Sequence, residues 1–204
     1  MGQVVVRRRA DGATELRVNG VFVMDDVETS SERRLAEHVL AAGAREVLVG
    51  GLGLGYTARA LLDGGATRVV VAELHAEVAR AVEAGAGAGP IADPRLEVVV
   101  ADIAEVVQAQ PAGSLDAICL DVDNGPDFLV HAGNEAIYGS DSIARCTAAL
   151  RPGGVLAVWS MADSPQLRRA LAEHLDDVEA IAVPVPLQGR DETYWILSGV
   201  AATA

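Results

Sequence analysis

Residues 47–62 read VLVGGLGLGYTARALL, and this stretch decides the fold. The apolar run Val47–Val49 predicts a buried strand, and a helix is predicted to begin near Tyr56. Between them lies a tight loop that contains four glycines: Gly50, Gly51, Gly53 and Gly55. A strand, a glycine loop and a helix N-terminus in this order bring backbone close to a nucleotide-like ligand.

An acidic residue follows at the distance that a ribose-binding carboxylate needs. The next predicted strand, RVVVAEL (68–74), contains Glu73 near its end, about 20 residues beyond the loop. A carboxylate there can accept hydrogen bonds from ribose hydroxyls, although it can also be a solvated strand end. The loop and Glu73 together indicate a nucleoside-type ligand.

Composition sets the fold class and excludes some partners. The chain of 204 residues is most simply one domain, and half of its residues are hydrophobic while only 3% are aromatic. This balance suits parallel strands covered by helices rich in alanine and leucine. The formal net charge of −13 disfavours nucleic acid and anionic membrane surfaces as partners, because like charges repel.

Cysteine usage and the absence of an apolar span predict a reduced, cytoplasmic location. Cys119 lies inside the apolar run AICL, and Cys146 lies on a predicted helix. The N-terminus lacks the order of a signal peptide, and no apolar run reaches membrane-spanning length. No cluster of cysteine and histidine has metal-ligand spacing, so no metal is expected.

The N-terminal residues predict a small antiparallel unit. Three strands, at 3–9, 14–18 and 21–24, are separated by the turn signals Asp11-Gly12 and Asn19-Gly20. An acidic turn follows, and Ser30 or Ser31 is predicted to cap a helix that ends at Gly43.

From residue 44 the pattern alternates between strand and helix. Such alternation predicts an α/β fold with a doubly wound, mostly parallel sheet. The expected strands are 46–50, 68–74, 96–102, 116–121 and 155–160, and the expected helices between them are 57–64, 76–85, 103–110 and 140–150. The end of the chain breaks the alternation, because a helix at 164–175 precedes two consecutive strands at 178–186 and 192–199.

This layout resembles the class I S-adenosylmethionine (SAM) methyltransferase fold, which has an antiparallel last strand. The loop has the GxGxG form, and Tyr56 stands where a nicotinamide-binding GxGxxG loop would have its last glycine. The LRPGG segment, 150–154, is a turn common in this fold. An NAD-dependent oxidoreductase is therefore disfavoured.

Further segments resemble the spermidine synthase family, a branch of this fold. They are VFVMDDVETSSERRLAEHVL, VVVAEL, VVVAD and AICLDVDNGPD, together with the glycine loop. The resemblance divides the chain into an N-terminal β-hairpin extension, 1–24, and a SAM-binding Rossmann-like transferase domain, 25–204.

The resemblance implies a site for a sulfonium donor, either SAM or decarboxylated SAM. Glu73 and Leu74 would contact the ribose, and Asp102 and Ile103 the adenine. The loop residues that would line the donor are Gly51, Leu52, Gly53 and Gly55. Asp102 is also the natural cap of the helix that follows it.

The resemblance also implies the catalytic residue. Asp121, at the carboxyl end of a strand, would contact the donor and take a proton as the acceptor attacks. Asp123 is a second candidate, because two close carboxylates raise one of their pKa values by repulsion. The alternative role for both is that of a loop or capping acid.

The acceptor half departs from the family pattern. The aspartate expected in the glycine loop is Leu54, and a glutamine expected in the acidic turn is Thr29. A tyrosine position aligns with His38, and the second acid of a DxxD motif aligns with Asn124. Together with Tyr138, His38 and Asn124 are the candidate acceptor-binding residues.

Some of these acceptor-side residues also have a purely structural interpretation. For His38, packing is a simpler role than acceptor binding. Tyr138 and Trp195 could form walls of the acceptor site, but packing is the simpler role for them too. Acidic residues in the turn before the helix, Asp25, Asp26 and Glu28, would favour a cationic acceptor if they faced the pocket.

Three functions remain open at this point. Because the polyamine-binding residues are changed, the sequence favours methyl or alkyl transfer from SAM to a small amine or hydroxyl acceptor. The alternatives are aminopropyl transfer from decarboxylated SAM to a polyamine, and a non-catalytic domain that binds a SAM-type ligand or a protein. A homodimer through the β extension or an edge strand is compatible with the sequence, which does not show it.

Overall fold

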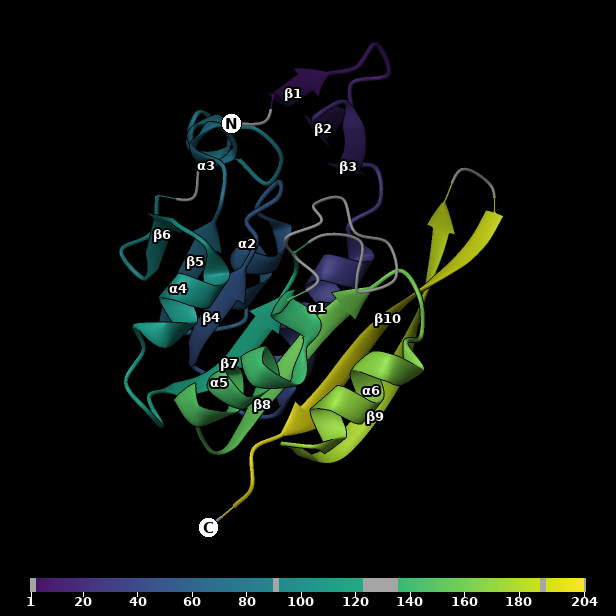
Figure 1. The fold of residues 1–204 in the computed structure, drawn as a ribbon. Coiled ribbons are helices and arrows are strands. Elements are labelled where there is room, and N and C mark those ends of the chain that lie inside the picture. Colours follow the sequence, from purple (N-terminus) through teal and green to yellow (C-terminus); the bar gives the residue numbers. More distant parts are fainter. Residues whose placement is uncertain (1–2, 90–91, 123–135, 188–189, 204) are drawn as a thin grey trace.

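The computed structural model describes residues 3–89, 92–122, 136–187 and 190–203. Within them, a seven-stranded sheet forms the body of the molecule, and a three-stranded sheet lies over one end of it (Figure 1). The strand order of the large sheet is β6-β5-β4-β7-β8-β10-β9, and that of the small sheet is β1-β2-β3. The predicted α/β class and the N-terminal β unit are confirmed.

The small sheet is antiparallel throughout. Its strands are β1 (Val4–Arg8), β2 (Thr14–Val18) and β3 (Val21–Asp25). Asn19 and Gly20 join β2 to β3 with φ angles of 54° and 78°. Positive φ at both positions is what a two-residue hairpin turn of type I′ requires, so the predicted Asn-Gly turn is confirmed.

The large sheet begins with parallel strands and ends with antiparallel ones. The strands that pair in parallel with one another are β4 (Glu46–Gly50), β5 (Arg68–Glu73), β6 (Leu96–Val100), β7 (Leu115–Leu120) and β8 (Leu150–Ser160). The last two strands are β9 (Asp176–Leu187) and β10 (Arg190–Val200), and β10 lies between β8 and β9, antiparallel to both. The expected antiparallel last strand is confirmed.

Helices cover both faces of this sheet. One face carries α1 (Ser30–Ala41), α2 (Tyr56–Asp63) and α3 (Ala76–Glu83), whose apolar residues join one core cluster. The other face carries α4 (Ile103–Gln108), α5 (Ser140–Ala149) and α6 (Pro165–Ala172), which join a second cluster. The central strands β4 and β7 are almost wholly buried between these layers, as a parallel sheet requires.

Two local predictions are wrong. Helix α1 begins at Ser30, so its N-cap is Thr29 rather than Ser30 or Ser31, and the Thr29 side chain makes no capping hydrogen bond. Strand β8 begins at Leu150, so the LRPGG segment lies within a strand rather than in a turn before it. The turn signal there is Gly153, whose φ is 77°, and it coincides with a shift in the pairing register between β7 and β8.

Candidate active site

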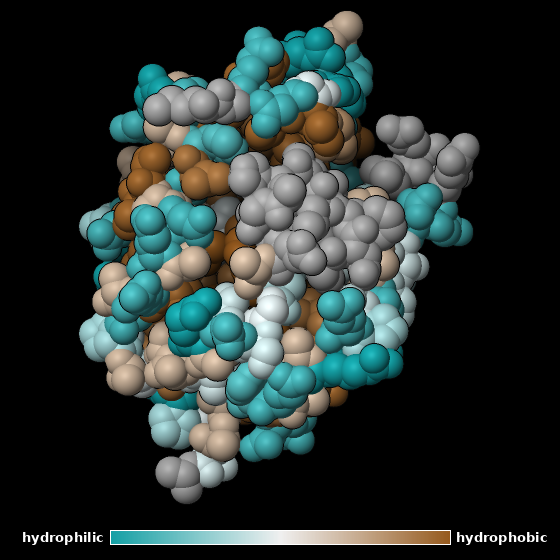
Figure 2. Space-filling view, in the orientation of Figure 1, coloured by the Kyte–Doolittle hydropathy of each residue, from teal (hydrophilic) through white to brown (hydrophobic). Residues whose placement is uncertain are grey.

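A cavity of about 390 Å³ lies where the carboxyl ends of the parallel strands meet the small N-terminal sheet. This edge is where open α/β sheets bind ligands, and the volume falls in the usual range for a small-molecule site. Hydrophobic surface gathers beneath the N-terminal sheet on the face shown in Figure 2. Three of the cavity's apolar residues are partly open to solvent: Phe22, Leu74 and Met161.

The glycine loop reaches the cavity through Gly51 and Gly53. Gly51 has a φ of 89°, and its N–H donates to the carbonyl of Ala72 at 2.8 Å. A Cβ atom on Gly51 would overlap the backbone oxygen of Asp121, closer than real carbon and oxygen atoms approach. Glycine is therefore required here, because the loop passes against the end of β7 with no room for a side chain.

The N-terminal sheet closes over the loop. A Cβ atom on Gly53 would lie 2.7 Å from the sulfur of Met24, which is on β3. Gly55 has a φ of 86° and forms the N-cap of α2, which begins at the predicted residue, Tyr56. Leu52 is buried beneath the loop and does not line the cavity, so the loop contributes mainly backbone to the site.

Glu73 holds the loop in place from the end of β5. One carboxylate oxygen accepts from the Leu52 N–H at 3.0 Å, and the other accepts from the His75 N–H at 2.7 Å. Burial raises the pKa of Glu73, and these backbone hydrogen bonds oppose the rise. A carboxylate keeps further lone pairs after two such bonds, so Glu73 can still accept from ribose hydroxyls at the cavity wall.

The expected adenine end of the site lies beside Glu73. Leu74, Asp102 and Ile103 all line the cavity, and Leu74 is 45% exposed. Asp102 is the N-cap of α4, where one side-chain oxygen accepts from the Ala104 N–H at 2.8 Å. The capping role predicted for Asp102 is confirmed, and the second carboxylate oxygen is available to a ligand.

Asp121 lies at the floor of the cavity, directly after β7. Its N–H donates to the Gly50 carbonyl at 2.8 Å, which fixes the backbone against β4. The hydroxyl of Thr57, on α2, donates to the Asp121 carboxylate at 2.6 Å. Burial raises the pKa of Asp121 to about 6, and the Thr57 hydrogen bond limits the rise. A carboxylate with such a pKa is suited to accept a proton near neutral pH.

Glu32 is a site residue that the sequence analysis does not single out. It lies in the first turn of α1 and lines the same cavity as Asp121, which it faces from a different element. Burial and the charge of Asp121 raise the pKa of Glu32 to about 7. The sequence does show an acidic residue at the start of a helix, next to the acidic turn. Surface helices commonly have an acid in their first turn, so this pattern alone does not mark a site residue.

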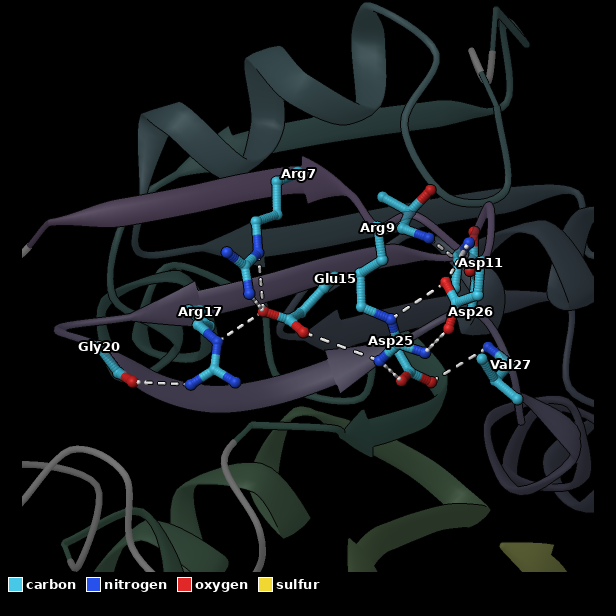
Figure 3. Close-up of polar contacts among 11 residues, drawn as sticks. Arg7, Arg9, Asp11, Glu15, Arg17, Gly20, Asp25, Asp26 and Val27 are labelled. Atoms are coloured by element: carbon cyan, nitrogen blue, oxygen red, sulfur yellow. Dashed lines mark hydrogen bonds and ion pairs between the residues drawn. The ribbon is translucent and has the colours of Figure 1, made fainter. Parts of the chain in front are cut away.

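The acidic turn contributes less free charge than its composition suggests (Figure 3). Asp25 lines the cavity, but Arg9 of the small sheet donates to its carboxylate at 2.7 Å and neutralises it. Asp26 accepts from the Thr14 N–H at 2.7 Å and does not line the cavity. Glu28 does line it, with one oxygen accepting from a backbone N–H.

The same network holds the small sheet together. Glu15 is 4% exposed, and guanidinium groups surround its carboxylate: those of Arg7, Arg9 and Arg17, at distances of 3.0, 3.7 and 2.5 Å (Figure 3). Arg7, Arg9 and Arg17 therefore serve the packing of the small sheet.

The two acceptor candidates that the structure describes, His38 and Tyr138, do not line the cavity. His38 faces away from it, with Nε2 at 3.0 Å from the Ser198 hydroxyl, and burial lowers its pKa. The Tyr138 hydroxyl donates to the Val122 carbonyl at 2.6 Å, and its ring is buried beside the cavity. Asp123 and Asn124 lie outside the described residues.

The aromatic wall comes from other residues than those proposed. Trp159 and Tyr194 line the cavity from β8 and β10, with ring centroids 4.9 Å apart. Trp195 instead points to the opposite face, where it packs against the second core cluster. Because alternate residues of a strand face opposite sides, one step along β10 decides which ring reaches the site.

Among the described residues, no group of three or more His, Cys, Asp and Glu side chains is arranged to hold a metal ion. No helix in this part of the chain is long and apolar enough to cross a membrane. The cytoplasmic location stays a prediction.

Comparison with known proteins agrees with the geometry. No family model matches the chain. The chain is 32% identical to a polyamine aminopropyltransferase of Mycobacterium tuberculosis, over 76% of this chain and 30% of the relative. It is 31% identical to a polyamine aminopropyltransferase of Nitrosomonas europaea, over 93% of this chain and 59% of the relative. The chain thus spans about three tenths and three fifths of these two relatives' length.

Solved structures share the fold. The spermidine synthase of Thermotoga maritima superposes with a TM-score of 0.77 and 16% identity, over all of this chain and 70% of that one. A probable spermidine synthase of Corynebacterium glutamicum gives a TM-score of 0.72 and 22% identity, over 98% and 78%. The chain therefore has the fold of these spermidine synthases, as the resemblance of its sequence implies.

The structure shows where the departures from the spermidine synthase-like pattern lie. In the spermidine synthase-like pattern the glycine loop carries an aspartate where this chain has Leu54. Leu54 is 1% exposed and packs in the core, and its carbonyl accepts from the Ala88 N–H at 2.9 Å. The Leu54 side chain therefore points away from the cavity. The glycine loop, residues 50–55, supplies no carboxylate to bind an acceptor.

Proposed function

We propose that this protein transfers an aminopropyl group from decarboxylated SAM to a small polyamine-type acceptor. The observation that carries the proposal is Asp121, a partly buried carboxylate with a raised pKa that faces the cavity beside the glycine loop. The relatives at 31–32% identity are polyamine aminopropyltransferases, which favours this alternative over the methyl transfer that the sequence alone favours.

The described residues fit such a donor. Glu73 and Asp102 each keep carboxylate lone pairs that face the cavity, where ribose hydroxyls and the adenine amino group would donate to them. The glycine loop lines the cavity with the backbone of Gly51 and Gly53, which a ligand can approach closely. The donor, when bound, supplies a carbon activated by its bond to a sulfonium, so the protein needs no metal to activate the leaving group.

The work of the chain is then alignment and proton transfer. The loop and Glu73 would hold the donor, and the rings of Trp159 and Tyr194 would pack against the methylene groups of the acceptor. Asp121 would accept a proton from the acceptor's amino group, so that the nitrogen lone pair is free to form the new carbon–nitrogen bond. Thr57 would keep the Asp121 carboxylate pointed at the acceptor.

A donor-by-acceptor assay tests this proposal. Purified protein is incubated with decarboxylated SAM or with SAM, in each case with putrescine and spermidine, and products are identified by mass. Aminopropylated amine formed only with the decarboxylated donor supports the proposal. Methylated amine formed from SAM would return the function to methyl transfer, and binding of either donor without any product would favour the non-catalytic alternative. Asp121→Asn is the matched inactive control.

A further inference from the structure

The acceptor half of the cavity contains a second carboxylate that is free to act. Among the described acids there, Asp25 is bound by Arg9, and Glu28 is anchored to the backbone N–H of Ser30. Glu32 has a single side-chain partner, the hydroxyl of Ser31, which donates to one oxygen at 2.7 Å. Apart from this hydroxyl and its own backbone N–H, Glu32 has no hydrogen-bond partner among the described residues, and it lines the cavity.

The placement of Glu32 is set by secondary structure. Strand β7 presents Asp121 from the sheet, and the first turn of α1 presents Glu32 from the helical layer that covers the sheet. A negative side chain is favourable in that turn, because the helix N-terminus carries partial positive charge. Glu32 and Asp121 thus lie on different rigid elements and face one cavity, where together they can bind a single cationic group.

The positive charges of the two reactants complement this pair of carboxylates. A primary amine with a pKa near that of lysine, about 10, enters as an ammonium, and the donor carries a positive sulfonium. Two ionised carboxylates beside the reacting atoms offset the charges of the reacting ammonium and of the sulfonium. Because Leu54 removes the acid that the family pattern has in the loop, this chain draws the second charge from α1.

We propose that Glu32 is a second catalytic residue, which binds the acceptor's reacting amino group opposite Asp121 so that the two carboxylates clamp one nitrogen. This inference rests on the proposed function. The ammonium donates one N–H to each carboxylate, and one of the two takes a proton. The lone pair thus released forms the bond to the donor's carbon, while the electron pair of the breaking carbon–sulfur bond returns to sulfur.

Other charged and titratable groups face Glu32 as well. Glu28 lies in the turn before α1, Tyr194 lies on β10, and Tyr56 lies on α2 with the Arg33 guanidinium 5.9 Å from its ring centre. Neither tyrosine ionises near neutral pH, since the pKa of each is raised above its ordinary value of 10. Asp121 is therefore the group whose titration is coupled most directly to that of Glu32.

The pH dependence of turnover tests the proposal. If both carboxylates must be ionised to receive the ammonium, a plot of log(kcat/KM) for the acceptor against pH should have a slope of about two on its acid limb. In Glu32→Gln the slope should fall to about one, and the limb should move to lower pH because a neighbouring negative charge is lost. The acceptor KM should rise about 10- to 100-fold, as expected for losing one charge-assisted hydrogen bond, while donor affinity stays unchanged.

Two controls make the result specific. Glu37→Gln removes an exposed acid of the same helix, paired with Arg34, and should leave the profile unchanged. Glu32→Asp keeps the charge and should restore the slope of about two even if activity is reduced. A slope and acceptor KM unchanged in Glu32→Gln would overturn the role of Glu32. Absence of aminopropyl transfer by the wild-type protein would instead overturn the proposed function, and this is seen before any variant is compared.

Discussion

Replacing Asp121 with asparagine should make the protein more stable at neutral pH while abolishing turnover. The carboxylate is buried after β7, and burial raises its pKa from the ordinary value of 3.8 to about 6. Between these two values the folded protein binds more protons than the unfolded chain. The stability that Asp121 contributes is therefore complete below about pH 4 and is lost as the pH rises through about 6.

The size of the effect follows from the size of the pKa shift. A shift of about 2 pH units corresponds to about 3 kcal/mol of unfolding free energy, at about 1.4 kcal/mol per unit. About 2 kcal/mol of this should be lost between roughly pH 4.5 and 7.5. Relief of the repulsion on Glu32 acts in the same direction. Asparagine can still accept the Thr57 hydroxyl, so the hydrogen bond is weakened rather than left unpaired.

Urea unfolding at a series of pH values measures this. The difference in unfolding free energy between Asp121→Asn and wild type should grow in favour of the variant as the pH rises from about 4.5 to 7.5. Asp63→Asn is the control, since this acid is exposed on α2, 4.0 Å from Arg59, and should give a nearly constant difference. A difference for Asp121→Asn that is independent of pH, or that favours wild type at the higher pH, would refute the reasoning.

Three other substitutions test the architecture around the cavity. Gly51→Ala should lower stability by about 2 kcal/mol or more and abolish donor binding, because its Cβ would strike the Asp121 backbone and φ is positive; calorimetry and urea unfolding measure both. Thr57→Val removes the hydrogen bond that holds down the pKa of Asp121, so the acid limb of kcat/KM should move to higher pH; an unmoved limb would contradict the contact. Arg9→Met frees the Asp25 carboxylate and removes a cation beside Glu15, so it should lower the urea midpoint of unfolding and raise the affinity for cationic ligands; unchanged affinity in a binding titration would show that Asp25 does not reach them.

Much of the donor half could be read from local sequence. The glycine spacing, the acid near the end of the next strand and the aspartate that opens α4 are features of single strand–loop–helix units, whose geometry short stretches of chain largely dictate. Gly51, Glu73, Asp102 and Asp121 accordingly all line the cavity. The fold class was equally accessible, because hydrophobic runs and two consecutive strands at the end encode a doubly wound sheet with an antiparallel last strand.

The acceptor half depended on tertiary structure. Leu54 points into the core, Trp159 and Tyr194 rather than Trp195 form the aromatic wall, and His38 turns toward Ser198. These outcomes depend on how α1, β8 and β10 pack against one another across long sequence separations. The raised pKa values of Glu32 and Asp121 have the same origin. Sequence alone determined which residues could carry charge, and only the packing, which buries both carboxylates against one cavity, decided that they titrate together.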